Sequence, residues 1–480
     1  MSQEQAAKSN TDLGLGALAV GLVGLTLGLQ ARWLGQDKLV RDGDEEGHVG
    51  AAELFLHDLL AGDTSSFFAR LLWQDMGDYP SLYPGLVGLW WWVMGGGPPE
   101  AVAVRAVNSV FLGLAGLGVL GLGRRLGLSW GAAALAGALT LAVPLNLGLS
   151  RAFMPEGALT ALTALTLWAA TGLRERRFLM PAFGVGLGLG LAALTKQTAP
   201  LFVLPGLFAL ARPGPWIIWA AVGASVAVPW WVVNFEEQRA YAEGSVVYAV
   251  EASALSQAFY YPRVLWESAL GPLWAVVAVV AAVLALRETS TRRLAVVALC
   301  WTLGGLLLLT LIPKKYDRLA APLLPGVALV IAAAAMTRPR LGLAALSLVG
   351  WSWWSSETDT PFNTPSEAER AFHPGCPQRW LRPPSPEGDL GLNAVVRAVA
   401  ERPPSSLAVV GSLDVPCAVQ TTFPWEQHLG PALRRAGVDV PEANPEVAGL
   451  VITLGAAGEG AGELVVPIPA LGAEAALRWR

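Results

Sequence analysis

The sequence predicts an α-helical polytopic membrane protein that ends in a small, more polar α/β domain. Of the 480 residues, 54% are hydrophobic and only 15% are charged, whereas about 25% of the residues in an average soluble protein are charged. Apolar runs recur up to residue 354, and the short loops between them carry arginines. Residues 356–480 lose this pattern, so we expect two domains, a membrane domain at 1–355 and a separate one at 356–480.

Composition also narrows the classes of partner. The net charge of -4 is small for this length and predicts no nucleic-acid partner. Three cysteines and four scattered histidines form no zinc or haem motif. A requirement for a divalent metal ion stays open, and no other cofactor is predicted.

The first apolar run, residues 13–34, is long enough to cross a hydrocarbon core of about 30 Å. It lacks a basic segment before it and is longer than a signal sequence, so we predict an uncleaved first span. Further predicted spans are 102–121, 131–149, 157–173, 179–194, 199–211, 216–233, 269–286, 294–312, 319–336 and 341–354. We therefore expect about eleven transmembrane helices.

Residues 35–100 form a long first outer loop with one apolar piece, residues 82–94. Pro84 and Gly85 interrupt this piece, and Trp90 to Trp92 favour the level of the lipid headgroups. We predict a helix that lies in the membrane interface. A short true span is the alternative.

Arginines concentrate in alternate loops, which predicts the orientation. If the first span runs outward and residues 82–94 are interfacial, all the arginine-rich loops fall on the cytoplasmic side. These loops carry Arg124, Arg125, Arg174, Arg176, Arg177, Arg212, Arg287, Arg292, Arg293, Arg338 and Arg340. We expect a protein of the inner membrane with a cytoplasmic amino terminus and an extracytoplasmic carboxyl-terminal domain.

Lysines follow the opposite distribution. Four of the five, Lys38, Lys196, Lys314 and Lys315, fall on the predicted outer side. Cations placed against the topological preference are candidates for function. The alternative is that they reach to the interface as anchors.

The carboxyl-terminal domain shows a mixed pattern. Residues 407–410, 450–454 and 464–468 are short apolar runs that suit buried strands, and residues 392–401 and 425–436 have helical character. We expect a small α/β domain that either covers the outer face or recognises the acceptor.

Charged groups on the predicted outer face suit group transfer. Asp44 and Glu45 follow the first span, together with His48, and Glu156 follows a later one. Carboxylates can act as a general base on a hydroxyl, and cations can stabilise a phosphate leaving group. The candidate cations are Arg151, Lys196, Lys314, Lys315 and Arg318. The alternative for the acidic cluster is a solvated loop.

In order and spacing, these segments resemble the polytopic glycosyltransferases of the C-type fold over about residues 13–336. The resemblance is to bacterial relatives of the protein O-mannosyltransferases and of the lipid A aminoarabinose transferase. The matching segments are Asp44-Glu45 with His48, Tyr79-Pro80-Ser81-Leu82-Tyr83, Arg105, Ser150-Arg151 with Glu156, Leu194-Thr195-Lys196, Pro229-Trp230-Trp231, and Lys314 to Arg318 with Pro322 and Pro325.

The resemblance implies a polyprenyl-phosphate sugar donor, inversion at the anomeric carbon, and a lipid, glycan or protein acceptor on the outer face. It makes Asp44 the catalytic base, with Glu45 as a second candidate. The five cations above would bind the donor phosphate, and His48, Asp78, Tyr79, Tyr83 and Glu156 would bind substrate. Relatives often have His or Lys where this chain has Asp78-Tyr79, and Asp at Glu156, so the sugar, the acceptor and the metal requirement stay open.

Two other functions compete with transfer. A transporter or flippase of a lipid-linked or anionic substrate usually places ionisable groups near the membrane midplane, in paired halves, whereas here they gather at one face. A non-catalytic scaffold of the same fold agrees equally well with the composition.

Cys376 and Cys417 are predicted to form a disulfide, because both lie in the exported domain. The intact protein should therefore gain the mass of two hydrogens on reduction. Two free thiols after purification without reductant would contradict the bond.

Overall fold

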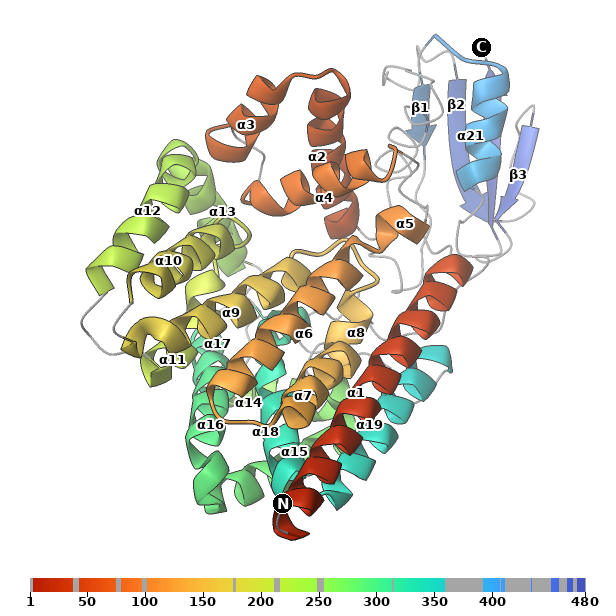
Figure 1. The fold of residues 1–480 in the computed structure, drawn as a ribbon. Coiled ribbons are helices and arrows are strands. Elements are labelled where there is room, and N and C mark those ends of the chain that lie inside the picture. Colours follow the sequence, from red (N-terminus) through yellow and green to blue (C-terminus); the bar gives the residue numbers. More distant parts are fainter. Residues whose placement is uncertain are drawn as a thin grey trace.

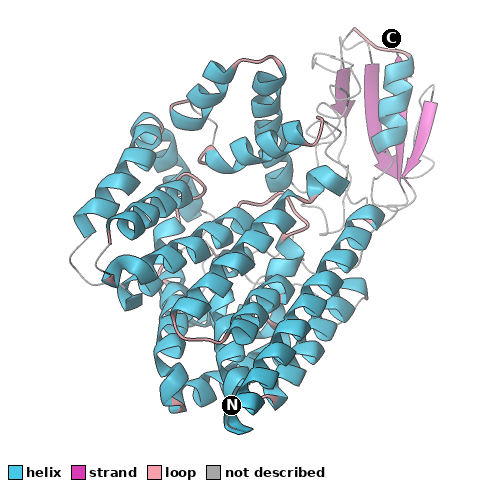
Figure 2. Ribbon diagram, in the orientation of Figure 1, coloured by secondary structure: helices cyan, strands magenta, loops and turns pink. Residues whose placement is uncertain are grey.

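The described part of the chain is mostly helical, and its strands lie near the carboxyl end (Figure 2). The computed structural model describes residues 3–37, 43–74, 79–96, 102–175, 178–210, 216–247, 254–312, 315–358, 392–405, 407–410, 433, 450–456, 464–468 and 473–479. Asp78, Lys314, Cys376, Cys417 and nearly all of the predicted helix 425–436 lie outside these residues.

The long first helix, α1 (Gln3–Gln36), packs against α7 (Trp130–Ala142) and α19 (Arg340–Glu357) (Figure 1). Leu15 and Leu22 are buried against these helices, whereas Leu13 and Val20 are exposed. Such a division suits a helix with one face on protein and the other on lipid, since lipid accepts apolar side chains.

Contacts at the two ends of α1 establish the direction of its neighbours. The Asp12 carboxylate accepts a hydrogen bond from the Gly131 N–H at 2.5 Å. At the opposite end, Arg105 Nη2 pairs with Asp37 Oδ2 at 2.9 Å, and α5 (Val102–Arg105) leads there into α6 (Val107–Arg125). Helix α6 therefore runs antiparallel to α1.

Arginine-rich loops gather at the end where α1 begins. Arg125 pairs with Glu175 at 2.7 Å, and Arg174 Nε donates to the carbonyl of Leu210 at 2.9 Å. These contacts join the ends of α6, of η1 (Thr171–Arg174) after α9 (Glu156–Ala170), and of α11 (Ala199–Leu210). This end is the predicted cytoplasmic end, and the orientation in the membrane stays a prediction.

Several described helices are long and apolar enough to cross a membrane. They are Asp12–Gln36, Val102–Arg125, Trp216–Val233 (α12) and Thr289–Thr310. Two bent pairs also qualify, Leu255–Ala269 with Gly271–Arg287 at 114°, and Asp317–Leu323 with Pro325–Thr337 at 45°. Shorter apolar helices are α7, α10 (Leu179–Ala193) and α11. The chain is a multi-pass membrane protein, and the total of about eleven spans stays a prediction.

Some predicted spans are broken by identifiable residues. Residues 131–149 form two helices, α7 and α8 (Pro144–Leu149), because Val143 precedes a proline and leaves the helical region at φ -54° and ψ 126°. The run 294–312 comprises α16 (Thr289–Leu299), the π-helical η3 (Cys300–Gly304) and α17 (Gly305–Thr310). The bent pairs comprise α14 (Ala254–Val264), η2 (Leu265–Ala269), α15 (Gly271–Arg287), η4 (Asp317–Leu323) and α18 (Pro325–Thr337).

The first outer loop folds into α2 (Gly43–Leu60), α3 (Thr64–Leu72) and α4 (Leu82–Val93), at the opposite end from the amino terminus (Figure 1). Helix α4 has 12 residues, about 18 Å at 1.5 Å per residue, which is less than the hydrocarbon core of about 30 Å. It packs closely on α2, since a Cβ on Gly88 would lie 2.8 Å from the carbonyl oxygen of Ala52. The short length of α4 favours the predicted interfacial helix over the alternative of a short true span. A further helix, α13 (Phe235–Val247), follows α12.

Near the carboxyl end, four strands form one sheet in the order β1-β2-β4-β3. They are β1 (Leu407–Val410), β2 (Leu450–Ala456), β3 (Leu464–Ile468) and β4 (Ala473–Trp479). Strand β1 pairs parallel with β2, while β4 pairs antiparallel with both β2 and β3. Helix α21 (Leu392–Glu401) buries Val395 and Val399, four residues apart on one face. The division into two domains stays a prediction.

The pair between Arg105 and Asp37 should contribute measurably to stability. Arg105 also donates to the carbonyl of Asp37 at 2.7 Å, so it covers the end of α1. Removing one partner of a buried pair costs about 3 kcal/mol, and we expect Arg105→Ala to lower the free energy of unfolding in detergent by this amount.

Arg239→Ala is the matched control, because Arg239 pairs with Glu243 at 2.8 Å on an exposed surface. Exposed pairs contribute about 0.2–1 kcal/mol. Equal destabilisation by the two substitutions would show that the buried pair has no special role.

Candidate functional site

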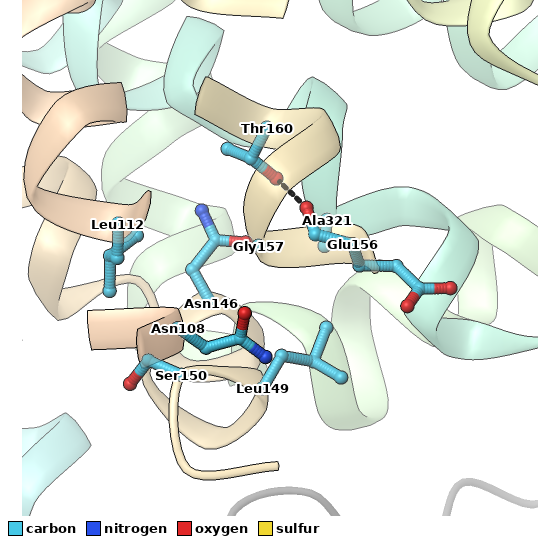
Figure 3. Close-up of a pocket in the computed structure, with 9 residues that line it drawn as sticks. All are labelled: Asn108, Leu112, Asn146, Leu149, Ser150, Glu156, Gly157, Thr160 and Ala321. Atoms are coloured by element: carbon cyan, nitrogen blue, oxygen red, sulfur yellow. Dashed lines mark hydrogen bonds between the residues drawn. The ribbon is translucent and has the colours of Figure 1, made fainter. Parts of the chain in front are cut away.

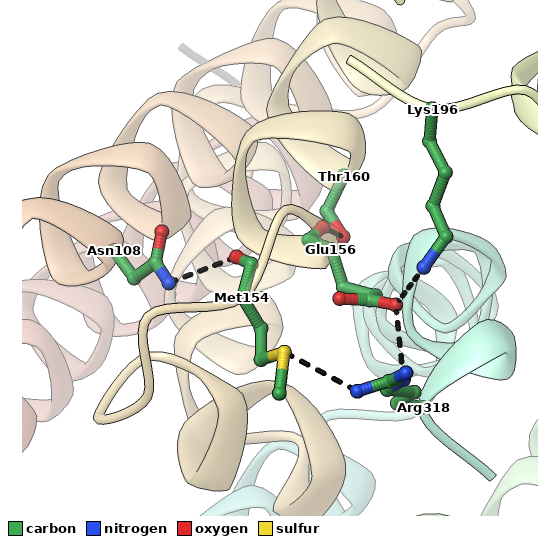
Figure 4. Close-up of polar contacts among 6 residues, drawn as sticks. All are labelled: Asn108, Met154, Glu156, Thr160, Lys196 and Arg318. Carbon is green, nitrogen blue, oxygen red and sulfur yellow. Dashed lines mark hydrogen bonds and ion pairs between the residues drawn. The ribbon is translucent and has the colours of Figure 1, made fainter. Parts of the chain in front are cut away.

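Three charged side chains converge at the end of the bundle beneath α2 to α4. Lys196 Nζ contacts Glu156 Oε1, and Arg318 Nε lies 3.6 Å from the same oxygen (Figure 4). All three residues are buried, with exposed fractions of 0% for Glu156, 6% for Lys196 and 2% for Arg318. We call this group the charge cluster.

Three distant segments of the chain supply the charge cluster. Glu156 is the first residue of α9, where the helix dipole favours a negative charge. Lys196 follows the end of α10, and Arg318 lies in the 3₁₀ helix η4. Helix α9 packs against both α10 and η4, which brings the two cations to the carboxylate.

The three groups carry one more positive than negative charge. Glu156 Oε2 is also buried and has no hydrogen-bond partner among the described residues. Two buried cations that converge on one carboxylate oxygen can also bind a second anion, such as a phosphate group, through charge-assisted hydrogen bonds.

A chain of polar contacts links the charge cluster to the first outer loop. Arg318 Nη1 donates to Met154 Sδ at 3.3 Å, and the carbonyl of Met154 accepts from Asn108 Nδ2 at 2.9 Å (Figure 4). Asn108 Nδ2 also donates to the Tyr83 hydroxyl at 3.1 Å. Through Asn108, helix α4 is thus connected to the loop that precedes Glu156.

Aromatic rings of the first outer loop lie near Lys196. The buried His48 ring is centred 4.7 Å from Tyr79 and 5.3 Å from Tyr83. Lys196 Nζ lies 5.9 Å from the centre of the Tyr79 ring. The sequence-predicted residues His48, Tyr79, Tyr83 and Lys196 are therefore brought together, and their roles in substrate binding stay predictions.

Glu45 lies near the same group, three residues before His48 on α2. Burial raises the pKa of Tyr83 well above its usual value, the hydrogen bond from Asn108 opposes this rise, and the charges of Glu45 and Glu156 add to it. The phenol is therefore neutral and can donate a hydrogen bond at physiological pH. Asp44 is the second residue of α2, and its side chain lies outside the described atoms.

Two residues predicted to bind the donor phosphate, Arg151 and Lys315, make their described contacts outside the charge cluster. Arg151 Nε donates to Gln30 Oε1 at 2.8 Å, and its guanidinium lies 4.3 Å from the Trp33 ring and 5.2 Å from the Trp353 ring. These contacts place Arg151 between α1 and α19, and its role in phosphate binding stays a prediction.

Lys315 Nζ donates to the carbonyls of Leu309, Thr310 and Ile312. An ammonium has three hydrogens to donate, and these three bonds cap the end of α17. Burial lowers the pKa of Lys315 to about 8.

A small polar cavity of about 10 Å³ adjoins the charge cluster, between α6, α8 and α9 (Figure 3). Both polar side-chain atoms of Asn146, and Oδ1 of Asn108, are buried with no hydrogen-bond partner in the described chain. The side chain of Glu156 points away from Asn146. The volume and the polar lining suit one ordered water molecule.

Sequence reasoning missed Asn108 and Asn146. Each is a polar residue inside an apolar run, and polar residues within spans often mark function. Their polarity within apolar runs was the signal in the sequence that could have identified these two residues. Within the part of the chain that the structure describes, no group of three or more His, Cys, Asp or Glu side chains could hold a metal ion.

Comparisons with known proteins bear on the fold. No protein-family model and no curated protein matches the sequence. Apo ArnT from Cupriavidus metallidurans matches with 13% identity and a TM-score of 0.59, over 95% of this chain and 97% of that chain. ArnT bound to undecaprenyl phosphate gives 14% identity, a TM-score of 0.60 and the same coverage.

An archaeal protein matches as well. AglB, an oligosaccharyltransferase from Archaeoglobus fulgidus in complex with an inhibitory peptide and a dolichol-phosphate, gives 13% identity and a TM-score of 0.50, over 93% of this chain and 65% of that chain. The resemblance predicted from the sequence is confirmed at the level of the fold: the chain has the C-type fold of these membrane glycosyltransferases.

Proposed function

We propose that the protein is a membrane glycosyltransferase that moves a sugar from a polyprenyl-phosphate donor to an acceptor hydroxyl, with inversion, on the outer face of the inner membrane. The observation that carries this proposal is the charge cluster of Glu156, Lys196 and Arg318, buried beneath the first outer loop. It lies away from the end where Arg125 and Arg174 gather.

Lys196 and Arg318 suit the phosphate of the donor. A cation aimed at developing negative charge stabilises a leaving group most strongly where water is excluded, and both residues are buried. The ArnT structure of similar fold holds undecaprenyl phosphate, and we infer a ligand of the same chemical class here. Lys314 stays a further candidate, whereas we assign Arg151 and Lys315 to positioning.

Asp44 or Glu45 would activate the acceptor. In the inverting step, the acceptor oxygen forms a bond to the anomeric carbon while the bond from that carbon to the phosphate oxygen breaks. The acceptor proton passes to the carboxylate, and the prenyl phosphate leaves with the bonding electrons. The start of α2, next to the group of His48, Tyr79 and Tyr83, is well placed for this base.

We propose that residues 1–355 form the transferase domain and that residues 356–480 form an extracytoplasmic domain that covers the outer face or recognises the acceptor. The sugar and the acceptor would be identified by mass spectrometry of cell-envelope glycans and lipids, with and without the intact gene.

The base is tested by Asp44→Asn and Glu45→Gln, which keep side-chain size and remove a proton acceptor. Loss of a general base lowers the rate by about 10²–10⁴, and we expect this fall for one of the two variants. The measurement is sugar transfer from a prenyl-phosphate donor in membranes with matched expression. Wild-type rates for both variants would favour the solvated-loop alternative.

The phosphate site is tested by Lys196→Gln. Loss of one group that stabilises a developing charge lowers the rate by about 10²–10³, and we expect a fall of this size in the same assay. Arg239→Gln, in an exposed pair, is the control and should keep the wild-type rate. If Lys196→Gln keeps it too, Lys196 does not act on the phosphate.

The topology is tested by single cysteines in a variant that lacks the three native ones. An impermeant thiol reagent applied to intact cells should label positions 243 and 458 and miss positions 175 and 289, because the arginine-rich loops face the cytoplasm. Labelling at position 175 from outside would overturn the proposed active face.

A further inference from the structure

We propose that Glu156 competes with the lipid phosphate for Lys196 and Arg318, so that its carboxylate displaces the prenyl phosphate after transfer. This inference rests on the proposed function, because it takes the phosphate to bind at these two cations. It gives Glu156 a role in product release.

The geometry shows a carboxylate held by one oxygen. Lys196 and Arg318 both approach Oε1, with Arg318 Nε at 3.6 Å (Figure 4). Oε2 has no hydrogen-bond partner among the residues that the structure describes. A guanidinium can bind both oxygens of a carboxylate, and Arg318 does not do so here. Glu156 therefore holds the cations with half of its acceptor capacity.

The backbone of Glu156 is fixed while its side chain has several rotatable bonds. The Thr160 hydroxyl donates to the carbonyl of Glu156 at 2.6 Å, within the first turn of α9. The carboxylate can therefore move away from the cations and return to them without a change in the helix.

The difference in charge between the sugar donor and the prenyl phosphate explains why release of the prenyl phosphate requires help. The phosphate of the sugar donor is a diester with one negative charge, whereas the prenyl phosphate that leaves is a monoester. A phosphate monoester carries about -1.5 to -2 charges at neutral pH. Transfer therefore strengthens the attraction between the phosphate and the two buried cations.

Glu156 offsets this attraction, because its carboxylate binds the same two cations as the phosphate would. When the prenyl phosphate leaves, the carboxylate returns to both cations and stabilises them. Loss of the Glu156 charge removes this competing anion, so the phosphate would be held longer.

If Glu156 has a positioning role, its removal should change the phosphate affinity in the opposite direction. If Glu156 only positions Lys196 and Arg318 for the phosphate, its removal weakens phosphate binding. If it competes, its removal tightens binding. The affinity for a prenyl monophosphate therefore separates the two roles, which a loss of transfer activity does not.

The test uses the full-length protein in lipid nanodiscs and undecaprenyl phosphate as the probe. We expect Glu156→Gln to bind the probe about tenfold more tightly than wild type, a change that corresponds to ~1.4 kcal/mol. The probe should also dissociate more slowly and inhibit transfer at lower concentration. Equal or weaker binding by Glu156→Gln overturns the proposal.

Two controls separate this inference from the proposed function. Glu175→Gln removes a carboxylate from the exposed pair with Arg125 and should leave the affinity unchanged. Lys196→Gln should lose binding. If it binds as wild type does, the phosphate site itself is wrong. If it loses binding while Glu156→Gln is no tighter, only the competition is overturned.

If Glu156→Gln does not fold, a second variant tests the same proposal. Glu156→Asp keeps the charge on a shorter side chain and should pair less well with Lys196, so it should bind undecaprenyl phosphate more tightly than wild type. The rise in melting temperature on addition of the probe should likewise be larger than for wild type. An equal or smaller rise contradicts the proposal.

Discussion

Compensation of buried charge is the constraint on which this structure depends. Glu156, Lys196 and Arg318 each have an exposed fraction of 6% or less, in a chain that is 54% hydrophobic. Separately they would be costly in such surroundings. Together they hold the start of α9, the end of α10 and the η4 turn at one point. The Asn108 amide then connects this point to Tyr83 and so to the helices that cover it.

Close packing of the helices makes this convergence possible. A Cβ on Gly118 of α6 would lie 2.9 Å from the carbonyl carbon of Ala164 in α9, and one on Gly190 of α10 would lie 2.9 Å from the carbonyl oxygen of Gly223 in α12. Small residues allow helix axes to approach closely in lipid, where the gain comes from contact and not from the hydrophobic effect. The elements that carry Glu156 and Lys196 are therefore held by backbone-to-backbone approach as well as by charge.

Composition and the length of apolar runs predicted the helical membrane class, the position of α1 and the short helix α4. The breaks at Val143 and at Cys300–Gly304 were not predicted, because a continuous apolar run carries no signal for a local change of helix type. Family resemblance predicted Glu156, Lys196 and Arg318 as site residues, the structure brings their side chains together, and their roles stay predictions. It did not show that Arg151 contacts a tryptophan ring of α1, since long-range partners leave no trace in local spacing. It also did not show that Lys315 caps the helix just before it, because a helix end inside an apolar run carries no local signal. The partners of Asn108 are likewise distant in sequence.

The polar contacts that hold α19 in place have a consequence for how this protein can change over evolutionary time. Glu357 pairs with Arg32 at 3.3 Å, and Ser356 accepts from Arg151 Nη2 at 3.3 Å. Trp274 Nε1 donates to Ser352 at 3.0 Å. An ion pair and two hydrogen bonds thus link α19 to α1, to α15 and to the loop before Glu156. Because Arg151 lies in the loop before Glu156, substitutions in α19 would reach the charge cluster through this loop, so we expect α19 and the cluster to change together.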